Sequence, residues 1–279
     1  MRITILAANS VCRTNSLNVK AENGLSLYIE SDERIILFDT GQTDLFIHNA
    51  EKMKIDLSQV DYLVISDGHF DHGGGLKHFL KINKKANIFL HKNAANKFYM
   101  KIFGFIPYYV GLDQKIIAQN SRIYFIEEDT QIEDKIILIE GFPELFPQPE
   151  ANKALFEKIK NRFIADKFNH ELAMLLIEND EIVLFTGCSH SGILNIIEEV
   201  KLYSKTMRIK ATFGGFHINN PITKKNESPE YLDKLAEALG ETDPVFYTGH
   251  CTGENNFRYI KGWMCRKIQT MNTGEVIEL

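Results

Sequence analysis

The sequence predicts an α/β protein, and three observations support this class. Short apolar runs rich in β-branched and aromatic residues recur along the chain, as expected of buried strands. Amphipathic segments with helix start and stop signals lie between several of these runs. Glycine-containing loops with histidine, aspartate or cysteine follow the runs, and strand ends of this kind converge at one edge of a sheet with helical connections.

Strands are expected where apolar residues are continuous enough to be buried. The segment from Met1 to Asn9 is interpreted as a first strand, because its apolar run is too short for a signal peptide or a membrane span. The other expected strands are Ile35–Phe38, Tyr62–Ile65, Asn87–Leu90, Ile136–Ile139, Ile182–Phe185, Ile209–Phe213 and Val245–Tyr247.

One predicted helix, Pro229–Leu239, has signals at both ends. Ser228 is a natural N-cap, proline fits the first helical position, and Gly240 fits the C-terminal stop. Apolar side chains recur at helical spacing, so one face of this helix is expected in the core. Helices are expected on similar grounds at Leu45–Met53, Leu76–Ile82 and Ile193–Tyr203.

The composition is that of an ordinary globular protein, with 279 residues, 44% hydrophobic and 25% charged. A formal net charge of −5 gives no electrostatic reason to expect nucleic acid or a membrane as partner. The four cysteines lack C-x-x-C spacing, which argues against a disulfide framework and a structural zinc knuckle. We therefore expect a cytoplasmic protein with a single domain over residues 1–279.

The region around residues 93–168 is less regular and is expected to be an insertion that shapes a substrate pocket. Within it, Pro143, Pro147 and Pro149 exclude regular structure between Phe142 and Glu150. This proline segment is either an exposed loop or a lid over a pocket. Its side chains indicate no particular ligand.

Four loops combine glycine with candidate metal ligands directly after a strand. Glycine allows the backbone to turn sharply and to approach a ligand closely. The histidines His48, His78 and His91 have no such glycine partners and are interpreted as ordinary residues. The four loops are Asp67–Gly75, Thr186–Gly192, Gly214–His217 and Thr248–Gly253.

The first of these loops has the densest set of ligands. Asp67, His69 and Asp71 alternate, so an extended backbone would point all three in one direction. His72 would point elsewhere and bind a second ion, since two metals about 3.5–4 Å apart are common in hydrolytic sites. Imidazole and carboxylate ligands suit zinc, iron or manganese. The loop therefore predicts one or two divalent metal ions.

These loops resemble the motifs of the metallo-β-lactamase superfamily. The segment from Asp67 to His72 is similar to the family's His-x-His-x-Asp-His, and the turn from Asp39 to Gly41 resembles its Asp-Thr-Gly turn. Three later segments resemble the branch named after an archaeal enzyme of methanopterin biosynthesis, the dihydropterin-ribofuranosyl-aminobenzene phosphate synthase: Thr186–His190, Gly214–His217 and Gly249–Gly253. The resemblance covers nearly the whole chain and implies an αββα sandwich of two mixed sheets, with metals at one sheet edge.

The resemblance also implies roles for individual residues. Asp71 would hold the nucleophile or act as base, and His217 is a ligand, a substrate contact or a proton donor. Asp39 and Thr40 would orient the ligating histidines. Cys188 is either a buried neighbour of the metals or a thiolate ligand. The implied metal ligands are Asp67, His69, Asp71, His72, His190 and His250.

The chain departs from the family pattern at Asp67, where the family has histidine. A carboxylate can bind the same metals and would shift the preference from zinc towards manganese or iron. Alternatively, the position is vacant and a single ion is bound. In a third interpretation Asp67 and His170 have exchanged roles, because related chains have an acidic pair where this chain has His170 and Glu171.

Three functions are compatible with these residues. The first is hydrolysis of a small ester or phosphoester by a metal-activated water. The second is a transferase reaction resembling that of the synthase, on a small and phosphorylated substrate. The third is non-catalytic sensing of a metal or ligand. A homo-oligomer is left open, and neither nucleic acid nor a membrane is expected as partner.

Asp67 distinguishes the interpretations of its loop. If its carboxylate binds a metal, Asp67→Ala should remove about one ion per chain, and Asp67→His should restore binding with a preference for zinc. Elemental analysis of protein purified without chelators measures both effects. An Asp67→Ala variant with undiminished metal content would indicate a vacant position instead. An exchange of roles with His170 would make the double change Asp67→His with His170→Asp better tolerated than either single change.

Overall fold

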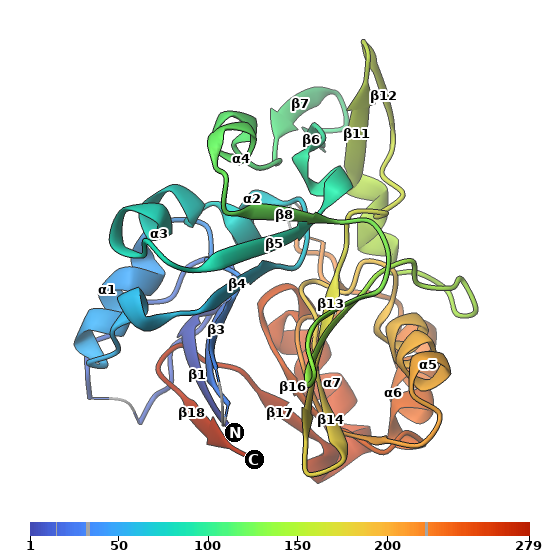
Figure 1. Cartoon of the computed structure of the whole chain (residues 1–279). Helices are drawn as coiled ribbons and strands as arrows, with labels where there is room; N and C mark the ends of the chain where they lie inside the picture. The colour runs from blue at the N-terminus through green and yellow to red at the C-terminus, as the bar shows by residue number, and fades with distance from the viewer. Residues whose placement is uncertain (15, 32–33, 221–222) are drawn as a thin grey trace. The chain divides into compact units, whose positions relative to one another are not determined.

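A computed structural model of the chain describes residues 1–14, 16–31, 34–220 and 223–279 (Figure 1). These residues form two compact units. Unit 1 contains Met1–Phe98, Val110–Glu127 and Met271–Leu279, and unit 2 contains Tyr99–Tyr109 and Glu128–Thr270. The chain therefore enters unit 2 twice and returns to unit 1 each time. A single domain over residues 1–279 stays a prediction.

Unit 1 is built on a seven-stranded mixed sheet with the order β18-β1-β2-β3-β4-β5-β8. Neighbours are antiparallel from β18 to β3 and parallel from β3 to β8. Core side chains such as Leu37, Leu63 and Ile88 are fully buried. The strands are β1 (Arg2–Ala7), β2 (Ser26–Glu30), β3 (Ile35–Phe38), β4 (Tyr62–Ile65), β5 (Asn87–His91), β8 (Ile123–Ile126) and β18 (Val276–Glu278).

The helices of unit 1 pack their apolar side chains into the same core. Phe46 and Phe79, from two different helices, are fully buried in one cluster with the strand residues. Burying two phenylalanine side chains contributes roughly 3–6 kcal/mol to the hydrophobic stabilisation of this layer. The helices are α1 (Leu45–Lys52), α2 (Phe70–Gly73), α3 (Leu76–Ile82) and α4 (Gln114–Gln119).

Unit 2 contains a second seven-stranded mixed sheet, with the order β17-β16-β15-β14-β13-β10-β9. Neighbours are parallel from β17 to β14 and antiparallel from β14 to β9. The strands are β9 (Thr130–Glu133), β10 (Ile136–Ile139), β13 (Ala173–Glu178), β14 (Glu181–Phe185), β15 (Arg208–Phe213), β16 (Val245–Thr248) and β17 (Ile268–Thr270).

Three longer helices of unit 2 share a hydrophobic core with this sheet. They are α5 (Ile193–Tyr203), α6 (Pro229–Gly240) and α7 (Glu254–Met264). At the start of α6, the Ser228 hydroxyl accepts a hydrogen bond from the Tyr231 N–H at 3.2 Å, as expected of an N-cap. Within the described part of the chain, no helix has both the length and the apolar character needed to cross a membrane.

A smaller four-stranded sheet, which we call the arm, has the order β12-β11-β6-β7. It consists of two antiparallel hairpins, one from residues 98–109 and one from residues 155–165. The hairpin of β11 and β12 extends away from the seven-stranded sheet of unit 2 (Figure 1). The strands are β6 (Phe98–Ile102), β7 (Ile106–Tyr109), β11 (Leu155–Ile159) and β12 (Arg162–Ala165).

The α/β class predicted from the sequence is confirmed, and every expected strand and helix is present. Apart from the N-terminal strand, their boundaries agree with the prediction to within one residue. Of the segment from Phe142 to Glu150, which was predicted to lack regular structure, the part up to Pro149 contains no helix or strand, and Glu150 begins a short 3₁₀ helix, Glu150–Ala154. The sequence did not predict the four strands of the arm, the strands β8, β9, β13, β17 and β18, or the helices α2, α4 and α7.

The glycines that follow His72 lie in a crowded turn. A methyl group on Gly75 would come within 2.4 Å of the Thr40 carbonyl oxygen and 2.6 Å of a Phe46 ring carbon. At Gly240, the last residue of α6, such a methyl group would meet no atom within 4 Å. Gly75 is therefore required by close packing, whereas Gly240 is not.

Gly75→Ala should destabilise the chain by about 1–3 kcal/mol, because the neighbouring backbone must shift to admit the methyl group. Gly240→Ala should be neutral or slightly stabilising, since alanine is the better helix former. Urea unfolding of the two variants measures the difference. Equal free energies of unfolding would contradict the crowding at Gly75.

Candidate metal centre

In unit 1 the predicted metal loop follows β4 and leads into α2. Asp67, His69 and His72 are buried there, with at most 4% of their surface exposed. A ring nitrogen of His69 lies 3.5 Å from one carboxylate oxygen of Asp67. A ring nitrogen of His72 lies 3.5 Å from the other oxygen. Three metal-binding side chains therefore meet inside unit 1, with the carboxylate between the two imidazoles.

The position of His72 differs from the sequence expectation, in which it pointed away from Asp67 and His69. That expectation assumed an extended backbone, but Phe70–Gly73 forms a helical turn that starts just after His69. His69 itself precedes this turn in extended backbone, and the two histidines reach different oxygens of Asp67, so a separate ion at His72 stays a prediction. Asp71 instead contacts Asn23, whose Nδ2 donates to its Oδ2 at 3.3 Å.

Asp39 orients His72 through a short buried hydrogen bond. Nδ1 of His72 donates to Oδ2 of Asp39 at 2.6 Å. Ser66 donates to the same carboxylate from its backbone N–H and from its hydroxyl, each at 2.7 Å. Because a carboxylate can only accept, Nδ1 of His72 holds a proton, so Nε2 is the nitrogen that would give its lone pair to a metal when the metal displaces the Nε2 proton. No sequence pattern indicated this role for Ser66.

Burial and two carboxylates determine the charge of His72. Burial disfavours the imidazolium, but the negative charges of Asp67 and Asp39 outweigh it and raise the pKa of His72 well above its ordinary value. Burial also raises the pKa of Asp39, against the opposing effect of His72. A divalent cation would supply the positive charge that two buried carboxylates require.

Unit 2 gathers its candidate ligands on the loops after β14, β15 and β16. Donor atoms of Cys188, His190 and His217 lie within 4.8 Å of one another, and all three residues are buried. The rings of His190 and His217 are 4.0 Å apart between centroids. A ring nitrogen of His250 lies within 4.8 Å of the Cys188 sulfur. Because these strands are parallel, the loops at their carboxyl ends share one edge of the sheet.

Asn152 and Glu171 hold His190, and sequence reasoning assigned neither a role. Nδ1 of His190 donates to the Asn152 side-chain oxygen at 3.0 Å, which leaves the lone pair on Nε2. The Asn152 amide donates in return to the His190 carbonyl at 2.8 Å. The Glu171 carboxylate accepts the N–H of His190 at 2.5 Å and that of Ser191 at 2.8 Å. Phe168 stacks on the imidazole with centroids 4.5 Å apart.

Cys251 adds a second thiol close to Cys188. Its sulfur accepts the backbone N–H of His217 at 3.2 Å and lies 3.6 Å from the Cys188 carbonyl oxygen. Burial disfavours the thiolate, but hydrogen bonds with Cys188 and His217 and the charges of His250 and His217 hold the pKa of Cys251 well below its usual value. Cys251 is in none of the groups of described side chains whose donor atoms could together hold a metal, so it supports the loops of His217 and Cys188 through these contacts.

His170 is paired with Asp166 inside unit 2. Nε2 of His170 lies 3.2 Å from Oδ2 of Asp166, and both side chains are at most 1% exposed. Oδ1 of Asp166 also accepts the N–H of Phe168 at 2.8 Å. His170 thus has a carboxylate partner four residues earlier in the chain. An exchange of roles between His170 and Asp67 stays a prediction.

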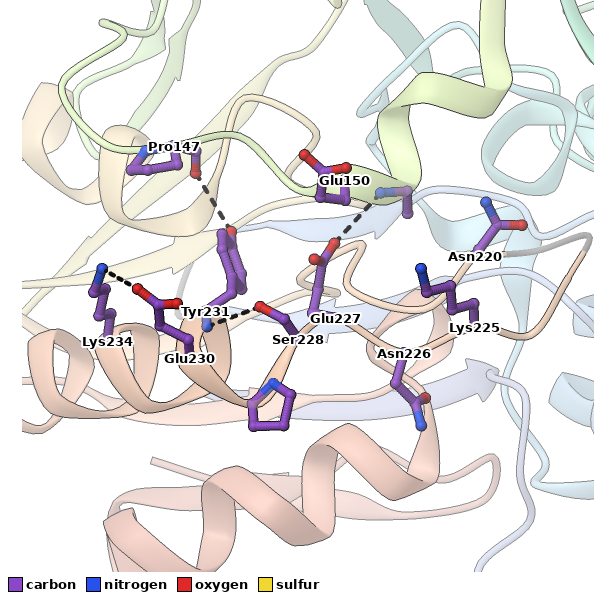
Figure 2. A pocket seen from close by; sticks show the side chains of 12 residues that line it. Pro147, Glu150, Asn220, Lys225, Asn226, Glu227, Ser228, Glu230, Tyr231 and Lys234 are labelled. Atoms are coloured by element: carbon purple, nitrogen blue, oxygen red, sulfur yellow. Dashed lines mark hydrogen bonds and ion pairs between the residues drawn. The ribbon is translucent and has the colours of Figure 1, made fainter.

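A cavity of about 680 Å³ lies beside the proline segment in unit 2 (Figure 2). The buried Glu227 carboxylate accepts the Ala151 N–H there at 3.4 Å, and the Tyr231 hydroxyl donates to the Pro147 carbonyl at 3.4 Å. The N–H groups of residues 145 and 146 donate to the Asn195 side chain. The proline segment is therefore tethered to α5 and α6. Among the described residues that line the cavity, none is a predicted metal ligand.

Two mixed sheets with helices, and a cluster of metal-binding side chains in each unit, define a metal-binding α/β protein. The chain belongs to the metallo-β-lactamase superfamily, whose family model matches residues 19–190. The match includes the loop from Asp67 to His72 and extends to His190. The resemblance found in the sequence and the fold class that it implied are confirmed.

Two proteins of Methanocaldococcus jannaschii are similar to the chain. The uncharacterized protein MJ0448 is 32% identical, over 84% of this chain and 85% of its own length. The second is 27% identical, over 92% of this chain and 90% of its own length. It is 7,8-dihydropterin-6-methyl-4-(beta-D-ribofuranosyl)-aminobenzene-5'-phosphate synthase.

Solved structures show the same fold. Tm1679, described as a metal-dependent hydrolase of the β-lactamase superfamily, is 28% identical with a TM-score of 0.83, over 100% of this chain and 99% of its own. Zn²⁺-bound PqqB from Methylobacterium extorquens has a TM-score of 0.58 at 11% identity, over 100% of both chains. The second likeness is one of fold alone.

His72→Ala and His250→Ala should each lower the metal content, because both are expected ligands. Asp39→Asn should weaken metal binding by about 10–100-fold, since it removes the group that orients His72. Metal titration followed by elemental analysis measures these effects. His78→Ala is the control, because His78 lies on α3 with its ring 3.8 Å from Asp44. A loss in His78→Ala as large as that in His72→Ala would contradict the assignment of the loop.

Proposed function

We propose that the chain is a metal-dependent hydrolase that acts on a small ester or phosphoester. One observation supports this most strongly, the buried series of contacts in unit 1 that runs from Asp39 through His72 to Asp67. Metal-binding histidines commonly donate their second ring N–H to a carboxylate in this way. Burying such charged groups is costly unless they are paired or bind a metal, so a bound cation accounts for the arrangement.

The donor types fit a divalent transition metal. Imidazole and carboxylate, with the Cys188 thiol in unit 2, suit zinc, manganese or iron. A divalent ion, when bound, lowers the pKa of water towards neutrality and polarises a carbonyl or phosphoryl group. We assign the ligand role to Asp67, His69, Asp71 and His72 in unit 1 and to His190 and His250 in unit 2.

Two of the chain's own side chains would handle the protons of the reaction. Asp71 is partly exposed and its carboxylate is held by Asn23, so we assign it the role of base towards the attacking water. His217 is buried with its ring against His190, and we assign it the role of proton donor to the leaving oxygen. Asn152 and Glu171 would keep His190 in place during both steps.

A panel of phosphomonoester, phosphodiester, lactone and thioester substrates tests this proposal. With Zn²⁺, Mn²⁺ or Fe²⁺ added, we expect metal-dependent turnover of at least one class. His217→Gln should lower kcat by about 10²–10⁴-fold with unchanged metal content, because proton donation is lost and the metal remains. His48→Ala on the exposed face of α1 is the control and should keep full activity. Fully loaded protein that turns over none of these substrates would favour the sensor function instead.

A transferase reaction is the second candidate, and the similarity to the pterin synthase over 92% of the chain favours it. In that case the bound metals would hold a phosphorylated sugar substrate, and no water molecule would attack the substrate. Reaction in ¹⁸O-labelled water separates the two. A hydrolase incorporates the label into one product, whereas a transferase leaves both products unlabelled.

The proposed substrate is a small molecule. If the chain catalyses a transferase reaction like that of the synthase, we propose that this substrate is phosphorylated. The proposed location is the cytoplasm, because the four cysteines are free and free thiols suit a reducing compartment. The net charge of −5 supports the proposal that neither nucleic acid nor a membrane is the main partner.

A further inference from the structure

The arm exposes a large apolar surface to solvent. Six of its side chains together expose on the order of 600 Å² of apolar surface, at the upper end of what monomeric proteins show in one patch. In the strands these are Ile106 at 46%, Tyr108 at 50%, Ile159 at 46% and Ile164 at 37%. In the turn between β6 and β7 they are Phe103 at 80% and Phe105 at 74%.

One face of the arm is an aromatic face that its own lysines cover. The rings of Tyr99 and Phe163 are 5.1 Å apart, so β6 and β12 direct these side chains to the same side. On that side Lys101 lies 3.9 Å from the centre of the Phe156 ring. Lys158 lies 5.3 Å from that of Phe163. Aromatic and cation–π contacts of this kind hold the arm together.

The opposite face is aliphatic, and the strand register defines it. Directly paired residues of antiparallel strands share a face, and successive residues alternate between faces. The pairs that do not contain the aromatic-face residues therefore lie together on the other side. We call this side the aliphatic face; its pairs are Met100 with Tyr108, Ile102 with Ile106, Glu157 with Ile164, and Ile159 with Arg162.

An apolar sheet face is stable when a second layer packs on it. Four side chains of the aliphatic face are at least 37% exposed, so this layer is missing from the single chain. Extension of the sheet at its β7 edge is opposed by Pro107, which has no N–H to donate to a further strand. A partner therefore fits over the face rather than along that edge.

The charges of the aliphatic face match a second copy of the same face. The face has one acid, Glu157, and one base, Arg162. In a dimer with two-fold symmetry, a contact between residue i of one copy and residue j of the other occurs twice, once in each direction. Glu157 of one copy can therefore lie opposite Arg162 of the other, and Arg162 of the first opposite Glu157 of the second. An anionic membrane or nucleic acid would need several cations, but Lys101 and Lys158 lie on the aromatic face.

We propose that the aliphatic face of the arm is a dimer interface between two copies of this chain. Together with Phe103 and Phe105 in the adjoining turn between β6 and β7, the exposed apolar area is about three quarters of the roughly 800 Å² that each partner contributes to a stable interface. The proposal does not depend on the metal centre, because it concerns only residues 98–109 and 155–165.

Analytical ultracentrifugation tests the proposal with the full chain. The wild type should sediment at twice its chain mass at micromolar concentration. The double variant Ile106→Asp with Ile164→Asp should weaken the dimer at least about 100-fold, because it buries charge at the centre of the interface. Leu202→Asp on α5, itself 60% exposed, is the control and should remain dimeric. Circular dichroism confirms that each variant is folded.

A charge exchange tests the two-fold arrangement. Glu157→Arg or Arg162→Glu alone should weaken the dimer, because each places like charges opposite one another. The combined variant should recover it, since opposite charges face each other again. A monomeric wild type would overturn the proposal, even if it bound vesicles of anionic phospholipid. A dimer that survives the Asp substitutions in the arm would overturn it too.

Discussion

Between Asp39 and His72, a hydrogen bond of 2.6 Å joins the end of β3 to the helical turn beyond β4. The two strands are parallel neighbours, so the bond can form only when their register is kept. A backbone hydrogen bond joins the same two segments, because the Thr40 N–H donates to the His72 carbonyl at 2.7 Å. This close approach leaves no room for a methyl group on Gly75, which meets the Thr40 carbonyl. The glycine at position 75 therefore follows from the same approach of β3 to the loop that orients the histidine.

Unit 2 orients His190 by a different chemistry. Its ring donates to the neutral amide of Asn152 rather than to a carboxylate. A carboxylate partner increases the basicity of a ligating imidazole, whereas an amide fixes the ring with little change in basicity. His72 is thus the stronger electron donor of the two. Glu171 contributes through the backbone, because it accepts the N–H groups of His190 and Ser191 and fixes the turn that presents the ring.

Much of the fold could be predicted because the relevant signals are local. Continuous apolar runs gave the central strands, and Ser228 gave the start of α6. The arm gave no such signal, because its strands alternate lysines with half-exposed aromatic and aliphatic residues, which periodicity does not separate from a loop. Helix α7 was missed although Phe257, Ile260 and Met264 recur at helical spacing, because no side chain caps its start as Ser228 caps α6.

The candidate site was predictable in its residue types and less so in its contacts. The loops that contain His72, His190, His217 and His250 follow strands and contain glycine, which is visible in the sequence. The hydrogen bond between Asn152 and His190 joins residues 38 apart, and no local pattern indicates it. The alternation argument for Asp67, His69 and Asp71 assumed an extended backbone, but a short helical turn forms from Phe70 to Gly73. Tertiary packing decided both points.

The edge strand β18 pairs with the first strand, β1, and completes the sheet of unit 1. The Thr273 side chain strengthens this closure by bonding the N–H and the carbonyl of Ala8. During synthesis β1 emerges long before β18, so one edge of β1 waits on the order of ten seconds or more for its partner. An open strand edge of this kind is a template for pairing with other chains. Unit 1 therefore completes its sheet only after β18 has been synthesised, and until then the outer edge of β1 is open to misassembly.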